Sequence, residues 1–105
     1  MKLIIFDEAQ EEIDELVAWY AKRDPIPAER LMDLFHDAVK RIASKPTQFS
    51  LLEMRRNPGD IRRVRLKGFP AYVGYQILEN EIHVFAVAHT ARKPGYWKSR
   101  LRRKR

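Results

Sequence analysis

The spacing of apolar residues changes once along this chain, and the change restricts the folds that the chain can adopt. In the first 45 residues, apolar side chains recur every three or four positions, as in helices that bury one face. From residue 61 the period becomes two, which is typical of β-strands. The whole chain has 105 residues, about the length of one domain. We therefore predict a single α+β domain spanning residues 1–105.

Two helices are expected before the sheet. Asp7 with Gln10 three residues later is a capping-box pattern, which predicts a helix start near Glu8. The apolar stripe of this helix comprises Ala9, Ile13, Leu16, Val17 and Tyr20. Residues 24–27 break the helix with two prolines, and Pro27 suits the first position of the next helix. The second stripe comprises Leu31, Leu34, Phe35, Ala38, Val39 and Ile42. The short connection predicts an antiparallel helical hairpin.

Strand patterns lie on both sides of the predicted hairpin. They cover residues 2–6, 61–66, 71–79 and 82–89. Residues 46–60 are interpreted as a loop, and residues 67–70 as a turn. The last strand is apolar on both sides, which indicates a central strand covered on both faces. The predicted order is β-α-α-β-β-β, with the helical hairpin packed on one face of a small, mainly antiparallel sheet.

Charge is unevenly distributed along the chain. Residues 1–60 carry 9 Lys/Arg and 12 Asp/Glu, a net charge of −3, whereas residues 61–105 carry 12 and 2, a net charge of +10. A basic half of this kind favours a polyanionic partner, either a nucleic acid or an acidic peptide. Six of the eight residues of the tail, 98–105, are basic. We expect this tail to be a frayed, solvated terminus, with contact to a phosphate backbone as the alternative.

Composition excludes several classes of protein. The chain has no Cys, which excludes a disulfide scaffold, a Cys-based zinc site and a thiol nucleophile. No apolar run has the length of a membrane span, and acidic residues begin at Asp7, where a signal peptide would need apolar ones. We therefore expect a cytoplasmic protein that does not contact membranes and has no cofactor and no metal site.

The first candidate site is a basic strand face. If the helices cover the side that carries Val64, then Arg63 and Arg65 project from the open side of the sheet, with Arg62 beside them. Guanidinium groups suit phosphate and carboxylate groups. The alternative is a solvated strand face whose charges prevent aggregation.

The second candidate site is the segment after the central strand. His89, Arg92, Tyr96 and Trp97 together offer an acid or base, a phosphate ligand and a stacking ring. Packing against the core is the favoured role for Trp97. His83 is expected on the same strand side as His89, but roughly 20 Å away, which excludes a shared metal ion. His83 is interpreted as a surface or partner residue, and the helix carboxylates as a solvated face and helix caps.

Motifs along nearly the whole chain resemble one family. Arg62-Arg63-Val64-Arg65-Leu66 is followed by Phe69-Pro70-Ala71-Tyr72, and a strand ending at His89 is followed by Arg92, Pro94-Gly95-Tyr96-Trp97 and Arg100. In these motifs the chain is similar to the RelE/ParE superfamily, the toxins of bacterial type II toxin–antitoxin modules, also called plasmid stabilisation modules. The resemblance implies the same β-α-α-β-β-β fold and a cognate acidic antitoxin as partner.

The resemblance also implies two possible targets. RelE-like members cut mRNA in the ribosome, and here His89, Arg92 and Tyr96 would be the catalytic residues. ParE-like members poison DNA gyrase and are not nucleases. RelE-like nucleases often use lysines near the middle of the chain, where this sequence has arginines, whose guanidinium groups are poor proton carriers. We therefore favour gyrase, with mRNA cleavage second and a degenerate toxin that only binds its antitoxin third. The expected contacts to nucleic acid or antitoxin are Arg62, Arg63, Arg65, Arg92 and Trp97.

Overall fold

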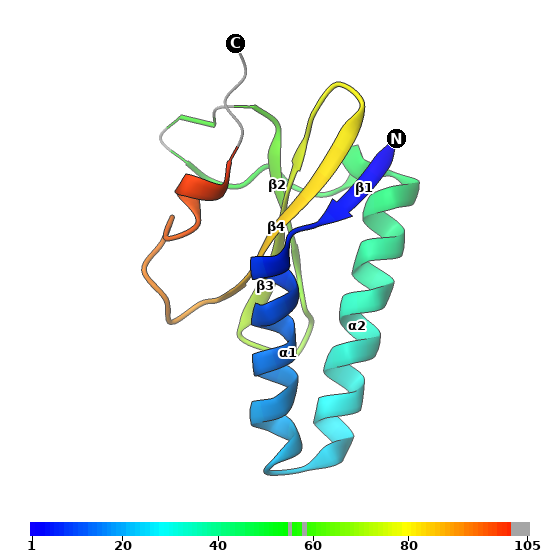
Figure 1. Cartoon of the computed structure of the whole chain (residues 1–105), viewed down its shortest axis with the longest axis vertical. Helices are drawn as coiled ribbons and strands as arrows, with labels where there is room; N and C mark the ends of the chain where they lie inside the picture. The colour runs from blue at the N-terminus through cyan, green and yellow to red at the C-terminus, as the bar shows by residue number, and fades with distance from the viewer. Residues whose placement is uncertain (55, 58, 102–105) are drawn as a thin grey trace.

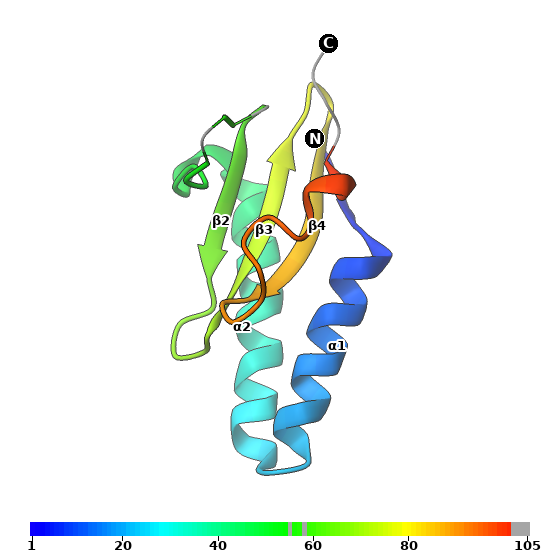
Figure 2. The same cartoon turned by 90° about the vertical axis from the view of Figure 1, so that its left-hand side faces the viewer.

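The computed structural model describes residues 1–54, 56–57 and 59–101. Its strands are β1 (Lys2–Ile5), β2 (Ile61–Arg65), β3 (Ala71–Ile77) and β4 (Glu81–His89), and they form one sheet in the order β1-β4-β3-β2. Its helices are α1 (Asp7–Ala21) and α2 (Pro25–Ser44), with short 3-10 helices at Pro46–Gln48 and Lys98–Arg100. Figures 1 and 2 show both long helices on one face of the sheet, as predicted.

Strand β4 is the centre of the sheet. It pairs in parallel with β1 and antiparallel with β3, and β3 pairs antiparallel with β2. All residues of β4 between its two ends are buried, which confirms the prediction of a central strand covered on both faces. The predicted order of elements is also confirmed. Strand β3 ends at Ile77, two residues earlier than predicted.

The helical hairpin is confirmed, and α1 begins near Glu8 as predicted, but the predicted cap of α1 and the predicted start of α2 are wrong. Helix α1 begins at Asp7 and has Phe6 as its N-cap, without a side-chain cap. The reason is that the Phe6 amide still donates to the Val84 carbonyl (2.9 Å), so the chain passes directly from strand to helix. Helix α2 begins at Pro25, because the carboxylate of Asp24 accepts from the Ile26 amide (3.0 Å) and caps the helix there.

A β-bulge in β4 changes which side chains share a face. Ala86 pairs with Gly74 and Val84 pairs with Tyr75, so Phe85 is the additional residue. Val84 therefore packs in the core under the helices, whereas Ala86 belongs to the cluster on the opposite, open face. The strict alternation predicted for this strand is wrong at the bulge.

The bulge also separates the two histidines of β4. His83 follows Ile82 of the helix-side core and so lies on the open face, whereas His89 follows Ala88 of the open-face cluster and so lies on the helix side. His83 is only 8% exposed, its ring centre is 5.0 Å from that of Phe6, and it contacts Glu81. The predictions of a shared side and of a surface role for His83 are both wrong.

The chain after β4 turns back over the open face of the sheet. Figure 2 shows this segment crossing in front of β3 and β4 and ending in the 3-10 helix at Lys98–Arg100. It brings Trp97 into a second small core with Phe85 and Ile61. The expectation of a frayed tail does not hold for Lys98–Arg100, and residues 102–105 lie outside the described residues. No helix of the described residues is long and apolar enough to cross a membrane.

Candidate functional site

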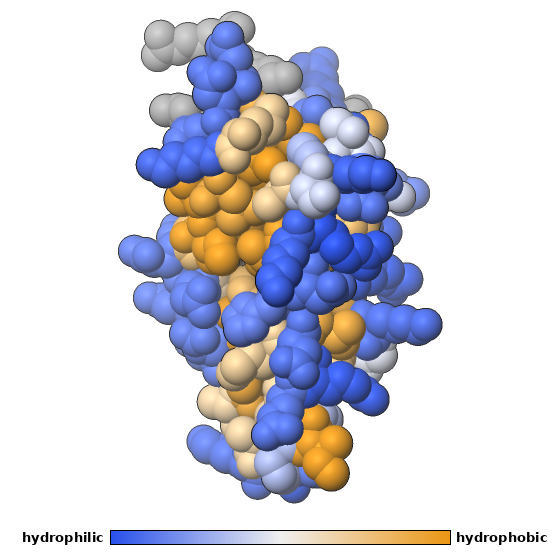
Figure 3. All heavy atoms as spheres, turned by 90° about the vertical axis from the view of Figure 1, so that its right-hand side faces the viewer, coloured by the Kyte–Doolittle hydropathy of each residue, from blue (hydrophilic) through white to orange (hydrophobic). Residues whose placement is uncertain are grey.

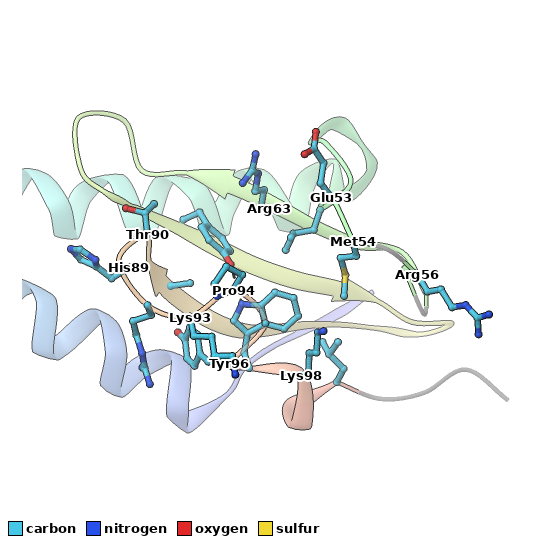
Figure 4. Close-up of a pocket in the computed structure, with 17 residues that line it drawn as sticks. Glu53, Met54, Arg56, Arg63, His89, Thr90, Lys93, Pro94, Tyr96 and Lys98 are labelled. Atoms are coloured by element: carbon cyan, nitrogen blue, oxygen red, sulfur yellow. Dashed lines mark hydrogen bonds between the residues drawn. The ribbon is translucent and has the colours of Figure 1, made fainter.

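The segment over the open face encloses a pocket of about 860 Å³. Its apolar wall includes Leu52, Met54, Tyr72, Pro94, Trp97 and Leu101. Figure 4 shows that the lining residues come from the loop before β2, from the sheet and from the C-terminal segment. The pocket therefore combines the two candidate sites predicted from the sequence, the basic strand face and the segment after β4.

Positive charge dominates the rim of this pocket. Arg56, Arg63, Lys93 and Lys98 line it, together with one carboxylate, that of Glu53. None of these four cations takes part in an ion pair among the described residues. The guanidinium carbon of Arg63 lies 5.8 Å from the centre of the Tyr72 ring. An apolar floor with unpaired cations at its rim suits an acidic surface that also carries apolar side chains.

Trp97 forms the floor of the pocket. It is 2% exposed, its Nε1 donates to the Tyr72 hydroxyl (2.9 Å), and its ring centre lies 4.7 Å from that of Phe85. The predicted packing role of Trp97 is confirmed. A ligand in the pocket would contact only the small part of the indole that remains accessible.

The structure separates the three arginines of the basic strand. Arg63 lies on the open face, as predicted. Arg62 lies on the other side, and it binds the Asp60 carboxylate (2.7 Å) and the Phe49 carbonyl (2.7 Å), so its guanidinium group holds the loop before β2. Arg65 is exposed at the end of β2 and does not line the pocket.

The main feature that sequence reasoning missed is Glu12. It belongs to α1, whose carboxylates the sequence predicts as a solvated face and helix caps, yet its side chain is only 12% exposed. Its carboxylate accepts from the Val87 amide (3.1 Å), from Arg100 (2.8 Å) and from the Tyr96 hydroxyl. Arg92 binds the same carboxylate at 3.2 Å. Glu12 thus fastens the C-terminal segment to α1 and β4.

Arg92 and Tyr96 are brought together by Glu12. The guanidinium carbon of Arg92 lies 3.8 Å from the centre of the Tyr96 ring. Burial and the hydrogen bond to Glu12 raise the pKa of the Tyr96 hydroxyl well above its usual value. The protonated hydroxyl donates to a carboxylate of the same protein.

His89 lies apart from this cluster. It is half-buried at the end of β4, and its Nδ1 accepts from the Ala91 amide (3.0 Å). It borders both the large pocket and a second hollow of about 450 Å³ on the helix side, which Trp19 and Tyr20 also line. Among the described residues, no three His, Asp or Glu side chains gather as metal ligands.

Comparison with known proteins identifies the family. Residues 3–94 match the family model described as the ParE toxin of the type II toxin-antitoxin system parDE. This chain belongs to the ParE toxin family. Toxin ParE2 of Mycobacterium tuberculosis, from strains CDC 1551 / Oshkosh and ATCC 25618 / H37Rv, is 31% identical to it over 95 residues, which are 90% of this chain and 86% of the relative.

A solved structure supports the fold of this ParE-family toxin. The chromosomal ParDE TA system from P. aeruginosa contains a chain that superimposes with a TM-score of 0.70 at 17% sequence identity. The superposition covers 85% of this toxin and 95% of that chain. At this level of identity the likeness concerns the fold. The family match itself includes Glu12, Arg63 and Arg92, and it ends before Tyr96 and Arg100.

Proposed function

We propose that this ParE-family toxin arrests bacterial growth by inhibiting DNA gyrase, and that an acidic antitoxin of the same module neutralises it. The proposal places the toxin in the cytoplasm, where gyrase acts on DNA. The target is inferred from the family and from the contacts of Arg92 and Tyr96, the residues that a ribonuclease of this superfamily would need.

The observation that carries the proposal is the engagement of Arg92 and Tyr96 by Glu12. By position, these two residues resemble the arginine and tyrosine of RelE-like nucleases. RNA cleavage needs a group that moves protons near neutral pH and a cation that faces the developing phosphorane charge. Here the Tyr96 hydroxyl is engaged by Glu12, and burial and this hydrogen bond move its pKa further above its usual value, while Arg92 faces a carboxylate of its own chain. Both side chains hold the C-terminal segment in place.

The surface chemistry also fits a protein target. The pocket on the open face presents cations that have no carboxylate partner among the described residues, around a floor of apolar side chains. Complementary charge directs the encounter and fixes the orientation of two proteins, while buried apolar groups provide much of the affinity. We expect Arg63 to be a main contact to gyrase, because it is the basic residue that the sheet itself positions in this pocket.

Two assays on one preparation test the target. The toxin is expressed inducibly, RNA 5′ ends are mapped across the transcriptome, and the purified protein is added to a gyrase supercoiling reaction. We expect lost supercoiling and unchanged mRNA ends. Arg63→Glu is expected to raise the concentration for half-inhibition by about tenfold or more. The exposed Lys22→Glu, which makes the same charge change at the end of α1, is expected to leave it unchanged.

The other outcomes identify the alternatives. New mRNA ends at defined codon positions together with normal supercoiling would mean a ribosome-dependent nuclease. Absence of growth arrest, with antitoxin binding retained, would mean a toxin that only holds its antitoxin. Equal inhibition by Arg63→Glu and Lys22→Glu would exclude the open face as the gyrase contact.

A further inference from the structure

An arginine–aromatic row joins the end of α1, the turn between β2 and β3, and the start of α2. It comprises, in order, the side chains of Arg23, Trp19, Tyr20, Phe69 and Arg30. The ring centres of Trp19 and Tyr20 lie 4.9 Å apart, and those of Tyr20 and Phe69 lie 5.1 Å apart. Figures 1 and 2 show these three segments at the lower end of the molecule, where the helical hairpin extends past the sheet.

Stacking orients the arginine at each end of the row. The guanidinium carbon of Arg23 lies 3.5 Å from the centre of the Trp19 ring, and that of Arg30 lies 5.3 Å from the centre of the Phe69 ring. Nη1 of Arg23 also donates to the Trp19 carbonyl (2.7 Å). Both arginines are exposed, and neither forms an ion pair among the described residues. Because the two groups are already ordered, they lose less conformational entropy when they bind an anion.

The turn that carries Phe69 adds further positive charge. Residues 65–70 contain Arg65 and Lys67 and no Asp or Glu. Both cations are exposed and form no ion pair within the part of the chain that the structure describes. Arg65 follows Arg63 by two residues and so projects on the same side of β2. The basic surface therefore continues from the pocket on the open face to the arginine–aromatic row.

The chemistry of this end favours duplex DNA over an acidic protein. Stable protein contacts depend on a buried apolar centre. On the face drawn in Figure 3, the continuous apolar area lies in the upper part of the molecule, and apolar groups around the hairpin tip are separated by hydrophilic side chains. Duplex DNA carries one negative charge per about 1.7 Å of its axis, so separated cations on a projecting end reach several phosphates without a matched pocket.

We propose that this end of the toxin binds the phosphate backbone of duplex DNA through Arg23 and Arg30. The inference rests on the proposed function only for its setting, which is gyrase that holds DNA. There the pocket on the open face would contact the protein, and the arginine–aromatic row would contact the DNA beside it. Phosphate contacts carry no sequence information, so we expect binding without sequence preference.

Fluorescence anisotropy of a short labelled DNA duplex, titrated with the purified toxin in the absence of gyrase, measures this contact. We expect saturable binding that weakens as the salt concentration rises. Arg30→Glu is expected to raise the Kd by about tenfold or more and to reduce the slope of log Kd against log salt by about 1.

Arg41→Glu is the matched control. Arg41 is also an exposed arginine of α2 whose guanidinium carbon lies over a phenylalanine ring, at 5.0 Å from the centre of Phe49, but it stands at the other end of the helix and pairs with Asp37 (3.8 Å). We expect it to change the Kd by less than about twofold. Lys22→Glu should behave like this control, because Lys22 lies about 160° from Tyr20 around α1 and so points away from the row. Equal weakening by Arg30→Glu and Arg41→Glu would overturn the proposal.

The fluorescence of Trp19 locates the bound duplex. Trp19 is 50% exposed beside Arg23, whereas Trp97, the second tryptophan of the chain, is 2% exposed. Binding is expected to change the tryptophan emission, and Trp19→Phe to abolish this change while the anisotropy still reports binding. Binding that leaves the Trp19 emission unchanged would place the duplex elsewhere and overturn the proposal.

Gyrase itself separates this inference from the proposed function. Gyrase inhibition by a toxin that does not bind the duplex would overturn this inference and leave the proposed function standing. Duplex binding at the row without gyrase inhibition would overturn the proposed function and leave the DNA contact standing. If Arg30→Glu weakens binding of the toxin to gyrase in the absence of DNA, the row contacts protein, and the assignment to DNA is overturned.

Discussion

Replacement of Glu12 by Gln is the most direct test of how the C-terminal segment is held. The variant keeps the size of the side chain and removes its charge. The carboxylate that it replaces binds the Val87 amide, the Tyr96 hydroxyl and the guanidinium group of Arg100. The Gln side chain has one acceptor oxygen and one amide donor. At least one of these three donors would therefore face another donor and lose its hydrogen bond.

The size of the effect follows from the exposure of the partners. Arg100 is only 16% exposed, so without Glu12 its charge stays largely desolvated and unpaired. A hydrogen bond to a charged group contributes about 1.5–3 kcal/mol. Arg92 is 54% exposed and adds little, because water screens it. We therefore expect Glu12→Gln to lower the free energy of unfolding by about 2–3 kcal/mol and the melting temperature by about 10–20 °C.

Urea denaturation followed by tryptophan fluorescence measures this change. A Trp19→Phe background leaves Trp97, on the segment that Glu12 holds, as the only indole. Glu11→Gln, an exposed neighbour on the same helix, is the control and is expected to change stability by less than about 0.5 kcal/mol. If Glu12→Gln and Glu11→Gln agree within that margin, the carboxylate does not stabilise the segment and our account of this cluster is refuted.

Two further predictions concern the sheet. Burial raises the pKa of Tyr75 to about 12, so its folded value exceeds its unfolded value. The contribution of Tyr75 to the free energy of unfolding is therefore fully present below a pH of about 10, and it is lost as the pH rises toward the folded pKa. Urea denaturation at a series of alkaline pH values should show a smaller decline for Tyr75→Phe than for the unchanged protein. In Gly74→Ala the new Cβ would lie 2.8 Å from the Phe85 ring, which should cost about 1–3 kcal/mol in thermal unfolding. Phe85→Leu in the same chain should remove at least half of that cost, and an unchanged cost would contradict the steric explanation.

The helices and strands were predictable because each depends on a local period. Ile13 and Phe35 are buried at the centres of the two helical stripes. Val64 is buried under the helices while Arg63 reaches the open face, as the period of two requires. Predicting these positions requires only the spacing between apolar residues, three or four positions in the helices and two in the strands, and the sequence contains that spacing directly.

The bulge in β4 was not predictable from that strand alone. It depends on the contact between the Phe85 ring and Gly74 of the neighbouring strand, where the absence of a side chain leaves room for the ring. A glycine inside a strand pattern is the available indication of a bulge. Because the bulge reverses the alternation, it also determined the faces on which His83 and His89 lie.

Glu12 shows why the contacts of the candidate site could not all be predicted from the sequence. Its place three residues after Ala9 and four before Leu16 puts it at the border of the apolar stripe, unlike the exposed Glu11, but its partners Tyr96 and Arg100 are 84 and 88 residues away. The basic half of the chain thus uses part of its charge internally, on a carboxylate from the acidic half. Arg63 and Lys98 have no such partner among the described residues. The cations that remain unpaired on the open face, rather than the charge count of the sequence, therefore define the surface available to a target.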